Sequence, residues 1–291
     1  MAASANQRAA SLKEAVSALQ RIAPLDLAEE WDNAGLLLAP TRSRPVRRIL
    51  LAIDATPHVV DEAVQRDVEM LVAYHPPWFF PVNRLTPDDD YSGRILRLIE
   101  NRIAVYSPHT ALDAAEEGVN DWLAGGMRTR PADRVECHPG SIARIVRFAL
   151  PVSGNALAKT IQQFLKVSYL RWMPSSDRRR RIRSLAVCAG AGVEALKETQ
   201  VDAWLTGEMK HHDLLAAQAR GIGVVLAEHS HTERGYLAVL RRRLNAELHG
   251  KATVLVSRAD REPLRLFTAV RDQPQPRQPS ATGSSRSRPS R

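Results

Sequence analysis

The stretch that decides the fold is Val224–Gly235, which reads VVLAEHSHTERG. It begins with a short apolar run, Val224–Leu226, of the kind that forms a buried strand. His229 and Glu233 follow, four positions apart, and a helical pattern continues from Glu233 to Asn245. The stretch therefore predicts a strand, a polar loop and a helix in succession.

The same alternation of apolar runs and amphipathic segments extends through most of the chain from Arg47 onward. Further strands are predicted at Ile49–Ile53, Met70–Tyr74, Ile103–Tyr106, Ile142–Leu150, Leu185–Val187, Ala203–Leu205 and Thr253–Val256. Further helices are predicted at His58–Arg66, Gly93–Asn101, Glu117–Ala124, Gly154–Phe164, Val193–Thr199 and Met209–Ala219, and a first one where Leu12, Ala15, Val16, Leu19 and Ile22 fall at helical spacing. Strands that alternate with helices indicate βαβ units. We therefore predict an α/β fold of three layers, α/β/α, around a mostly parallel sheet.

We expect residues 1–270 to form this α/β domain, in two halves at about 10–127 and 183–270. The proline-containing segment 128–182 interrupts the alternation of strands and helices. It is interpreted as a short strand–helix–strand unit between two halves of one sheet. Residues 271–291 are Pro, Ser, Gln and Arg with almost nothing apolar. Such a segment cannot offset its ordering entropy, so we predict a disordered basic tail.

The formal charge of +9 is concentrated in two short segments. The run Asp177–Arg183 and the tail Arg271–Arg291 each hold five Arg and one Asp, and together they account for eight of the nine charges. A nucleic-acid-binding domain spreads its basic residues over a folded face. We therefore expect no specific nucleic-acid partner and interpret both segments as solvated; a nuclear-import or polyanion patch at Arg178–Arg181 is the alternative.

Two cysteines, Cys137 and Cys188, are too few for a secreted disulfide scaffold, so a reducing compartment is expected. No apolar run has the length of a membrane span, and no membrane partner is expected. The N-terminus is rich in Ala with Arg8 and Lys13 but no acid before Glu14, which leaves a mitochondrial transit peptide open. We expect a cytoplasmic protein, with nuclear residence also open.

Residues able to bind a metal or transfer a proton follow the predicted strands. In open α/β sheets, ligands bind beyond the carboxyl ends of the strands. Five predicted strands are followed there by an acid, an imidazole or both: Asp54; His75; His109 and Asp113; Glu208; and Glu228, His229, His231 and Glu233. Mixed imidazole and carboxylate ligands suit Zn, Mn, Fe, Co or Ni, whereas Ca²⁺ prefers oxygen alone. The pattern therefore indicates a divalent-metal site.

Each of these residues also has an ordinary structural explanation. A His followed by Pro, as at His75, is often structural, Asp54 and Asp113 can cap helices, and His211 and His212 can face solvent. The loop Ala189–Gly192 after a predicted strand can bind an anion or simply form a tight turn. Only the conjunction of several such residues favours a metal site.

Six sequence blocks in order resemble the NIF-three-like family, also described as GTP cyclohydrolase I type 2-like. The blocks are Glu30–Leu36, Asp54–Thr56, Tyr74–Pro77, His109–Asp113, Leu205–Glu208 and His229–Gly235. The resemblance runs from about Leu12 to Val270, and Tyr74–Pro77 looks like the eukaryotic branch. It implies an α/β/α fold, a homo-oligomer in the form of a hexameric ring, and two metal ions per chain.

Carried over block by block, the family's metal ligands fall on His75, Asp113, His229 and Glu233. The first His of the family's His-His-Pro motif is replaced by Tyr74. A phenol with a pKa near 10 is a poor ligand at neutral pH. We therefore expect one good metal position and one weak or empty position.

The sequence supports two classes of function. The first is a metal-dependent hydrolase, acting on a GTP-like ring or a phosphoester, with Glu208, His212 and Asp54 as proton carriers. The second is a non-catalytic interaction protein that holds a structural metal and binds protein partners in transcription; the family resemblance implies this, because eukaryotic relatives are associated with transcriptional co-repressor partners.

Overall fold

A computed structural model describes residues 8–42, 44–138, 141–175, 181–264 and 267. Every helix and strand named below lies in one compact unit that ends at Arg261. The expectations for the tail at 271–291, and for Arg178–Arg180 of the arginine run, lie outside the described residues.

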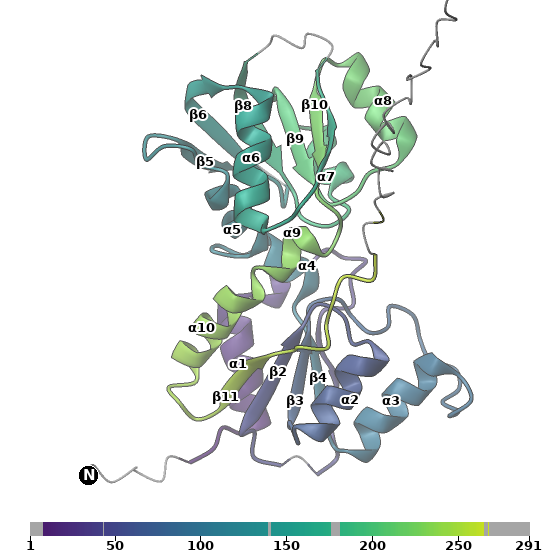
Figure 1. Cartoon of the computed structure of the whole chain (residues 1–291). Coiled ribbons are helices and arrows are strands. Elements are labelled where there is room, and N and C mark those ends of the chain that lie inside the picture. Colours follow the sequence, from purple (N-terminus) through teal and green to yellow (C-terminus); the bar gives the residue numbers. More distant parts are fainter. Residues whose placement is uncertain (1–7, 43, 139–140, 176–180, 265–266, 268–291) are drawn as a thin grey trace, which may run out of the picture. The chain divides into compact units, whose positions relative to one another are not determined.

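The first sheet has five strands in the order β1-β4-β3-β2-β11 (Figure 1). Their bounds are β1 Gly35–Leu38, β2 Arg48–Ala52, β3 Met70–Ala73, β4 Ala104–Ser107 and β11 Thr253–Val256. The last four strands run parallel, and β1 pairs antiparallel with β4.

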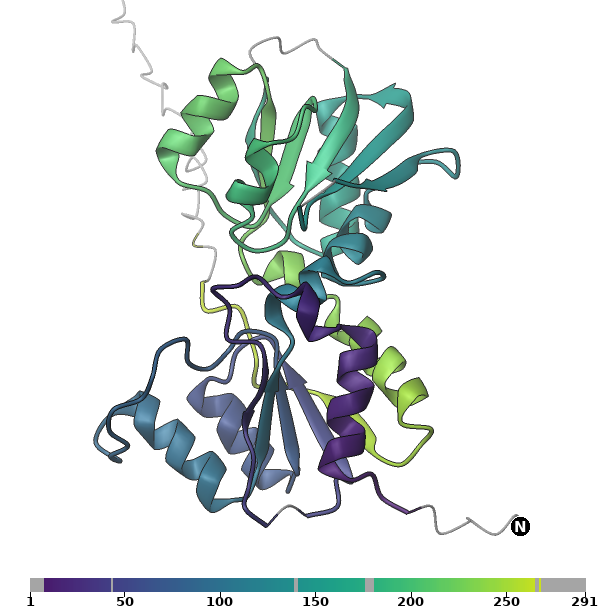
Figure 2. The same ribbon diagram turned by 180° about the vertical axis from the view of Figure 1, so that it is seen from behind.

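Helices cover both faces of this sheet, as Figures 1 and 2 show from opposite sides. These helices are α1 Leu12–Ile22, α2 Pro57–Gln65, α3 Asp90–Glu100 and α10 Leu237–Glu247. Alternate residues of β2 face opposite ways, so Ile49 and Leu51 pack in the core with α1 and α10 while Leu50 and Ala52 pack with α2 and α3. Burial on both faces explains why the parallel strands read as continuous apolar runs.

The second sheet has six strands in the order β5-β6-β8-β9-β10-β7. Their bounds are β5 Arg134–Cys137, β6 Arg144–Val152, β7 Arg171–Met173, β8 Ile182–Val187, β9 Ala203–Thr206 and β10 Gly223–Leu226. Strands β8, β9 and β10 are parallel, and the other three pair antiparallel. The helices around it are α5 Val119–Gly126, α6 Gly154–Leu165, α7 Val193–Lys197 and α8 His211–Ala219.

The predicted α/β class is confirmed, but the strands divide between two sheets. The interpretation of 128–182 as a unit between two halves of one sheet is therefore wrong: this segment supplies β5, β6 and β7 to the second sheet, while β11 returns to the first. Strand periodicity does not reveal which strands pair, because pairing is a contact between segments far apart in sequence.

Local differences also have physical reasons. The predicted helix Glu233–Asn245 is divided into α9 His231–Arg234 and α10 at Gly235, where a Cβ atom would lie 2.5 Å from the Trp122 ring. Strands β1 and β5 and the short helix α4 His109–Ala114 were not predicted. Strand β5 has only four residues and is exposed throughout, so its alternation of polar and apolar residues is too short to reveal a strand.

None of the helices in the described part of the chain has both the length and the apolar character needed to cross a bilayer.

Candidate metal centre

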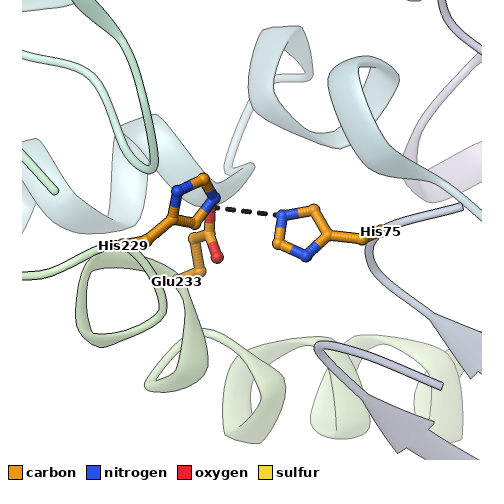
Figure 3. A group of neighbouring side chains, drawn as sticks. All are labelled: His75, His229 and Glu233. Carbon is orange, nitrogen blue, oxygen red and sulfur yellow. Dashed lines mark ion pairs between the residues drawn. The ribbon is translucent and has the colours of Figure 1, made fainter. Parts of the chain in front are cut away.

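Three predicted ligands come together from the loops that follow strands of different sheets. His75 lies two residues after β3, whereas His229 precedes α9 and Glu233 lies within it, both after β10 (Figure 3). Glu233 Oε1 lies 3.6 Å from His75 Nε2 and 3.2 Å from His229 Nε2. Each of the three residues offers one ligand atom, and these three atoms all lie within 4.8 Å of one another. The carboxyl ends of the two sheets thus contribute to one cluster.

Glu233 is the buried centre of this cluster. Its side chain is 3% exposed, and its Oε2 atom has no hydrogen-bond partner among the described residues. Burial raises the pKa of the carboxyl group, but hydrogen bonds with His229 and His75 outweigh that effect and lower it overall. A buried carboxylate oxygen without a partner is costly unless a cation or a proton donor satisfies it.

Two carboxylates orient the imidazoles. Asp54 Oδ1 lies 2.9 Å from His75 Nδ1, and Glu208 Oε1 lies 2.9 Å from His229 Nδ1. With Nδ1 of each ring engaged, Nε2 is directed towards Glu233 (Figure 3). A carboxylate that holds the far nitrogen of a histidine is the usual outer partner of a metal ligand.

The same carboxylates perturb both histidines. Burial alone would lower the pKa of His75, but hydrogen bonds with Asp54 and Glu233 raise it to about 10. The hydrogen bond with Glu233 is the main cause that raises the pKa of His229 to about 9. Without a metal, both rings therefore carry a proton at neutral pH, and a cation that binds there must displace it.

A glycine leaves room beside the cluster. Gly190 has a φ of 62°, and a Cβ atom on it would lie 2.6 Å from Glu233 Oε1 and 3.0 Å from His229 Nε2. Its N–H donates to Thr232 Oγ1 at 2.8 Å, which ties the bend to α9. The loop Ala189–Gly192 is thus a tight bend between β8 and α7 that shapes the cluster.

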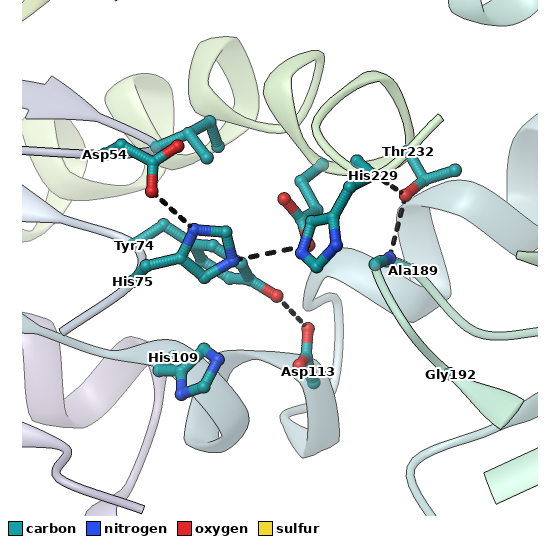
Figure 4. Close-up of polar contacts among 12 residues, drawn as sticks. Asp54, Tyr74, His75, His109, Asp113, Ala189, Gly192, His229 and Thr232 are labelled. Carbon is teal, nitrogen blue, oxygen red and sulfur yellow. Dashed lines mark hydrogen bonds and ion pairs between the residues drawn. The ribbon is translucent and has the colours of Figure 1, made fainter. Parts of the chain in front are cut away.

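Asp113, the fourth predicted ligand, has a different partner. The Tyr74 hydroxyl donates a short hydrogen bond to its Oδ1 atom (Figure 4). Burial raises the pKa of Asp113 to about 7 and raises the pKa of Tyr74 well above its ordinary value. Asp113 does not belong to the three-residue group, so its role as a ligand stays a prediction.

The three predicted proton carriers occupy different places. Asp54 and Glu208 contact the two histidines, and about half of each side chain is exposed. His212 lies exposed near the start of α8, with its ring against His211 at a centroid distance of 5.6 Å. Among the described contacts, none joins His212 to the cluster.

Sequence reasoning missed the pairing of Asp32 with His109. Asp32 Oδ1 lies 2.7 Å from His109 Nδ1, and the Asp32 side chain is fully buried. Burial raises the pKa of Asp32, but the hydrogen bonds from His109 and Thr110 lower it overall. His109 in turn packs edge-on against His75, at a centroid distance of 5.4 Å. Both residues stand in recognised blocks, but nothing in the sequence joins positions 77 residues apart.

The donor set fits a divalent cation. Two imidazole nitrogens and a carboxylate suit a transition metal or zinc, and the unpaired Glu233 oxygen supplies the charge that a cation would neutralise. The cluster is therefore a possible metal site formed by His75, His229 and Glu233.

Known proteins of similar sequence cover nearly the same length. The Schizosaccharomyces pombe protein NIF3 homolog is 37% identical over 254 residues, which span 82% of this chain and 91% of that protein. NIF3-like protein 1 of Drosophila melanogaster is 35% identical, over 87% of this chain and 88% of its own. The Saccharomyces cerevisiae NGG1-interacting factor 3 is 34% identical, over 88% and 96%.

Solved structures share the fold. A Bacillus cereus protein related to NIF3 superposes with a TM-score of 0.72 at 20% identity, over 88% of this chain and 98% of that one. Reduced HcgD from Methanocaldococcus jannaschii gives a TM-score of 0.72 at 25% identity, over 84% and 96%. The profile of the Duf34/NIF3 (NGG1p interacting factor 3) family matches residues 10–263. The resemblance noted in the sequence is confirmed, and the chain belongs to the Duf34/NIF3 family.

Proposed function

We propose that this protein is a metal-dependent hydrolase in which His75, His229 and Glu233 hold one divalent ion of the Zn, Mn, Fe, Co or Ni group. The observation that carries the proposal is the buried Glu233 carboxylate, which faces two imidazole nitrogens and keeps one oxygen unpaired. Such an ion, when bound, lowers the pKa of coordinated water and polarises an electrophilic carbon or phosphorus centre.

The residues around the three ligands have distinct tasks in this proposal. Asp54 and Glu208 hold the two histidines with Nε2 towards Glu233. Glu208 is 53% exposed, so its carboxylate can also accept a proton from the reacting centre and release it to solvent. No described contact joins His212 to the cluster, so we assign the proton transfer to Glu208 ahead of His212 and Asp54.

One ion per chain is the stoichiometry that we propose. A second position would need a ligand in place of the missing family histidine, and the Tyr74 hydroxyl is already engaged with Asp113. Burial raises the pKa of Tyr74, so its phenolate form is not available near neutral pH.

A second candidate function is that of an interaction protein with a structural metal. The name of the Saccharomyces cerevisiae relative, NGG1-interacting factor 3, supports a protein partner, and the family resemblance implies that this partner acts in transcription. In this reading the protein works as a homo-oligomer in the cytoplasm or nucleus, and the hexameric ring implied by the resemblance is its assembly.

Elemental analysis and an activity screen of the purified full chain test the first proposal. The screen offers GTP and phosphate monoesters and diesters with added Zn²⁺ or Mn²⁺. We expect about one ion per chain and turnover of at least one substrate class, with both lost in Glu233→Gln. The matched control is Glu136→Gln on the exposed strand β5, which should keep both.

Metal bound normally by Glu233→Gln would overturn the ligand assignment. Metal binding without any turnover, together with partner binding that survives Glu233→Gln, would instead favour the interaction protein.

A further inference from the structure

A cavity of about 470 Å³ is lined by residues from loops that follow strands of both sheets, among them Ala191, the residue after Gly190. Trp31 and Thr110 line one side, and Ala191 and Gly192 line the other. Pockets that hold a small organic ligand have volumes of roughly 300–1,000 Å³. The cavity thus has room for a single ring system with substituents.

Trp31 is unusually exposed for a residue on such a firmly held segment. The residue is 65% exposed. The flanking backbone is fixed from both sides, because Thr110 Oγ1 accepts from the Glu29 N–H at 3.0 Å and the Asn33 side chain donates to the Trp78 carbonyl at 2.7 Å. A large aromatic surface held rigidly in solvent is a preorganised contact for a ligand, since little conformational entropy is lost on binding.

Aromatic rings connect the cavity to the metal cluster. Trp31 packs against His109 at a centroid distance of 5.8 Å, and His109 packs against His75 at 5.4 Å. Phe79, itself 43% exposed, lies 6.3 Å from Trp31. On the opposite wall, Gly190 faces Glu233 while its neighbours Ala191 and Gly192 line the cavity. A ring seated on Trp31 would therefore present its substituents towards the metal ligands.

The charged residues that line the cavity indicate the charge of the ligand that it favours. Glu29, Glu194 and Glu198 line the cavity, and none of its lining residues is basic. Lys197 pairs with Glu194 at 2.7 Å, so the negative charge that acts on a ligand comes mainly from Glu29 and Glu198, which form no ion pair among the described residues. Carboxylates beside an indole face favour a planar cation over an anion, because the ring quadrupole attracts positive charge as well.

We propose that this cavity binds a planar, positively charged heteroaromatic ring, stacked on Trp31, as the part of the substrate that positions it for the metal centre. The assignment of the ring as part of a substrate rests on the proposed hydrolase. The binding of the ring itself does not.

The test uses three planar probes of nearly equal size: 1-methylnicotinamide with charge +1, neutral nicotinamide, and nicotinate with charge −1. Isothermal titration calorimetry follows each one binding to the metal-free full chain in the presence of a chelator. We expect 1-methylnicotinamide to bind about tenfold more tightly than nicotinamide, and nicotinate to bind weakest. Nicotinate binding as tightly as the cation would overturn the proposal.

Variants separate stacking from charge. Trp31→Ala should abolish binding of all three probes and Trp31→Phe should retain part of it, while Phe80→Ala, which removes another aromatic that is 82% exposed, should leave the affinities unchanged. The double variant Glu29→Gln/Glu198→Gln should bind cation and neutral probe equally. Retained binding in Trp31→Ala, with an unchanged thermal midpoint, would refute the site. Because no metal is present, this result stands apart from failure of the proposed hydrolase, which elemental analysis detects.

Discussion

At the scale of single residues, the centre depends on how carboxylates are shared among imidazoles. Glu233 faces two histidines at once, and each histidine has a second carboxylate behind it. This arrangement holds both rings in one orientation before any cation arrives. The energetic consequence is competition between protons and the metal for the same nitrogen atoms.

That competition predicts a pH dependence of metal affinity. The pKa values of His75 and His229 are raised to about 10 and about 9, so a binding metal releases protons at neutral pH. We expect the apparent affinity for Zn²⁺ to rise steadily from pH 6.5 to pH 9, with proton release visible in titrations in buffers of different ionisation enthalpy. An affinity that does not change over this range would contradict the assignment.

The same shifts affect the metal-free protein in the opposite direction. Since the folded-state pKa values exceed the unfolded value of 6.5, the stabilisation is complete below that pH and is lost as pH rises through 9 to 10. The thermal midpoint of the metal-free chain should therefore fall over this alkaline range more than that of Glu233→Gln.

Tyr74 offers a third prediction at this scale. Tyr74→His restores an imidazole where the hydroxyl now donates to Asp113, and it frees the carboxylate from that hydrogen bond. We expect the metal content to rise from about one towards two ions per chain, as measured by elemental analysis. Tyr74→Phe is the control, because it frees Asp113 without adding a ligand; an increase in this variant as well would assign the effect to Asp113 alone.

At the scale of elements, the short connections after the strands create the site, while the long helices only support it. The bend at Gly190 combines a left-handed φ of 62° with close contact to Glu233 and His229. Helix α9 has four residues, and it places Glu233 one turn after His229. A substitution in either connection should reduce metal affinity more strongly than it disturbs the sheets.

Gly190→Ala tests this view. A Cβ atom 2.6 Å from Glu233 Oε1 must displace the carboxylate, and the positive φ adds strain of roughly 1–2 kcal/mol. We expect at least a hundredfold loss of metal affinity by competition with a chromogenic chelator. Gly125→Ala in α5 is the matched control, because a Cβ atom there meets nothing within 4 Å. Equal affinities in the two variants would show that Gly190 does not shape the site.

At the scale of the whole compact unit, the centre joins loops that belong to different sheets. His75 follows β3 of the first sheet, and His229 and Glu233 follow β10 of the second. A cation held by all three would bind only the folded arrangement and so stabilise it through mass action.

Metal removal should therefore lower stability. With free Zn²⁺ at a hundred times its Kd, the expected stabilisation is about 2.7 kcal/mol. Differential scanning calorimetry should show a higher midpoint with Zn²⁺ than with a chelator, and no difference for Glu233→Gln. A zinc-dependent midpoint that persists in Glu233→Gln would place the stabilising ion elsewhere in the chain.

The amino-acid sequence by itself determined most of the local elements and the residue types of the centre. The apolar runs at Met70–Ala73 and Val224–Leu226 predicted strands because buried parallel strands are apolar on both faces. His75, His229 and Glu233 stood among the acids and imidazoles that follow such strands, at the edge where ligands bind, and the family resemblance singled them out as ligands. Only the tertiary structure decided that there are two sheets, that Tyr74 holds Asp113 and that Asp32 holds His109. These are contacts between residues far apart in the chain, and periodicity reports only the environment of each residue, not the identity of its neighbour.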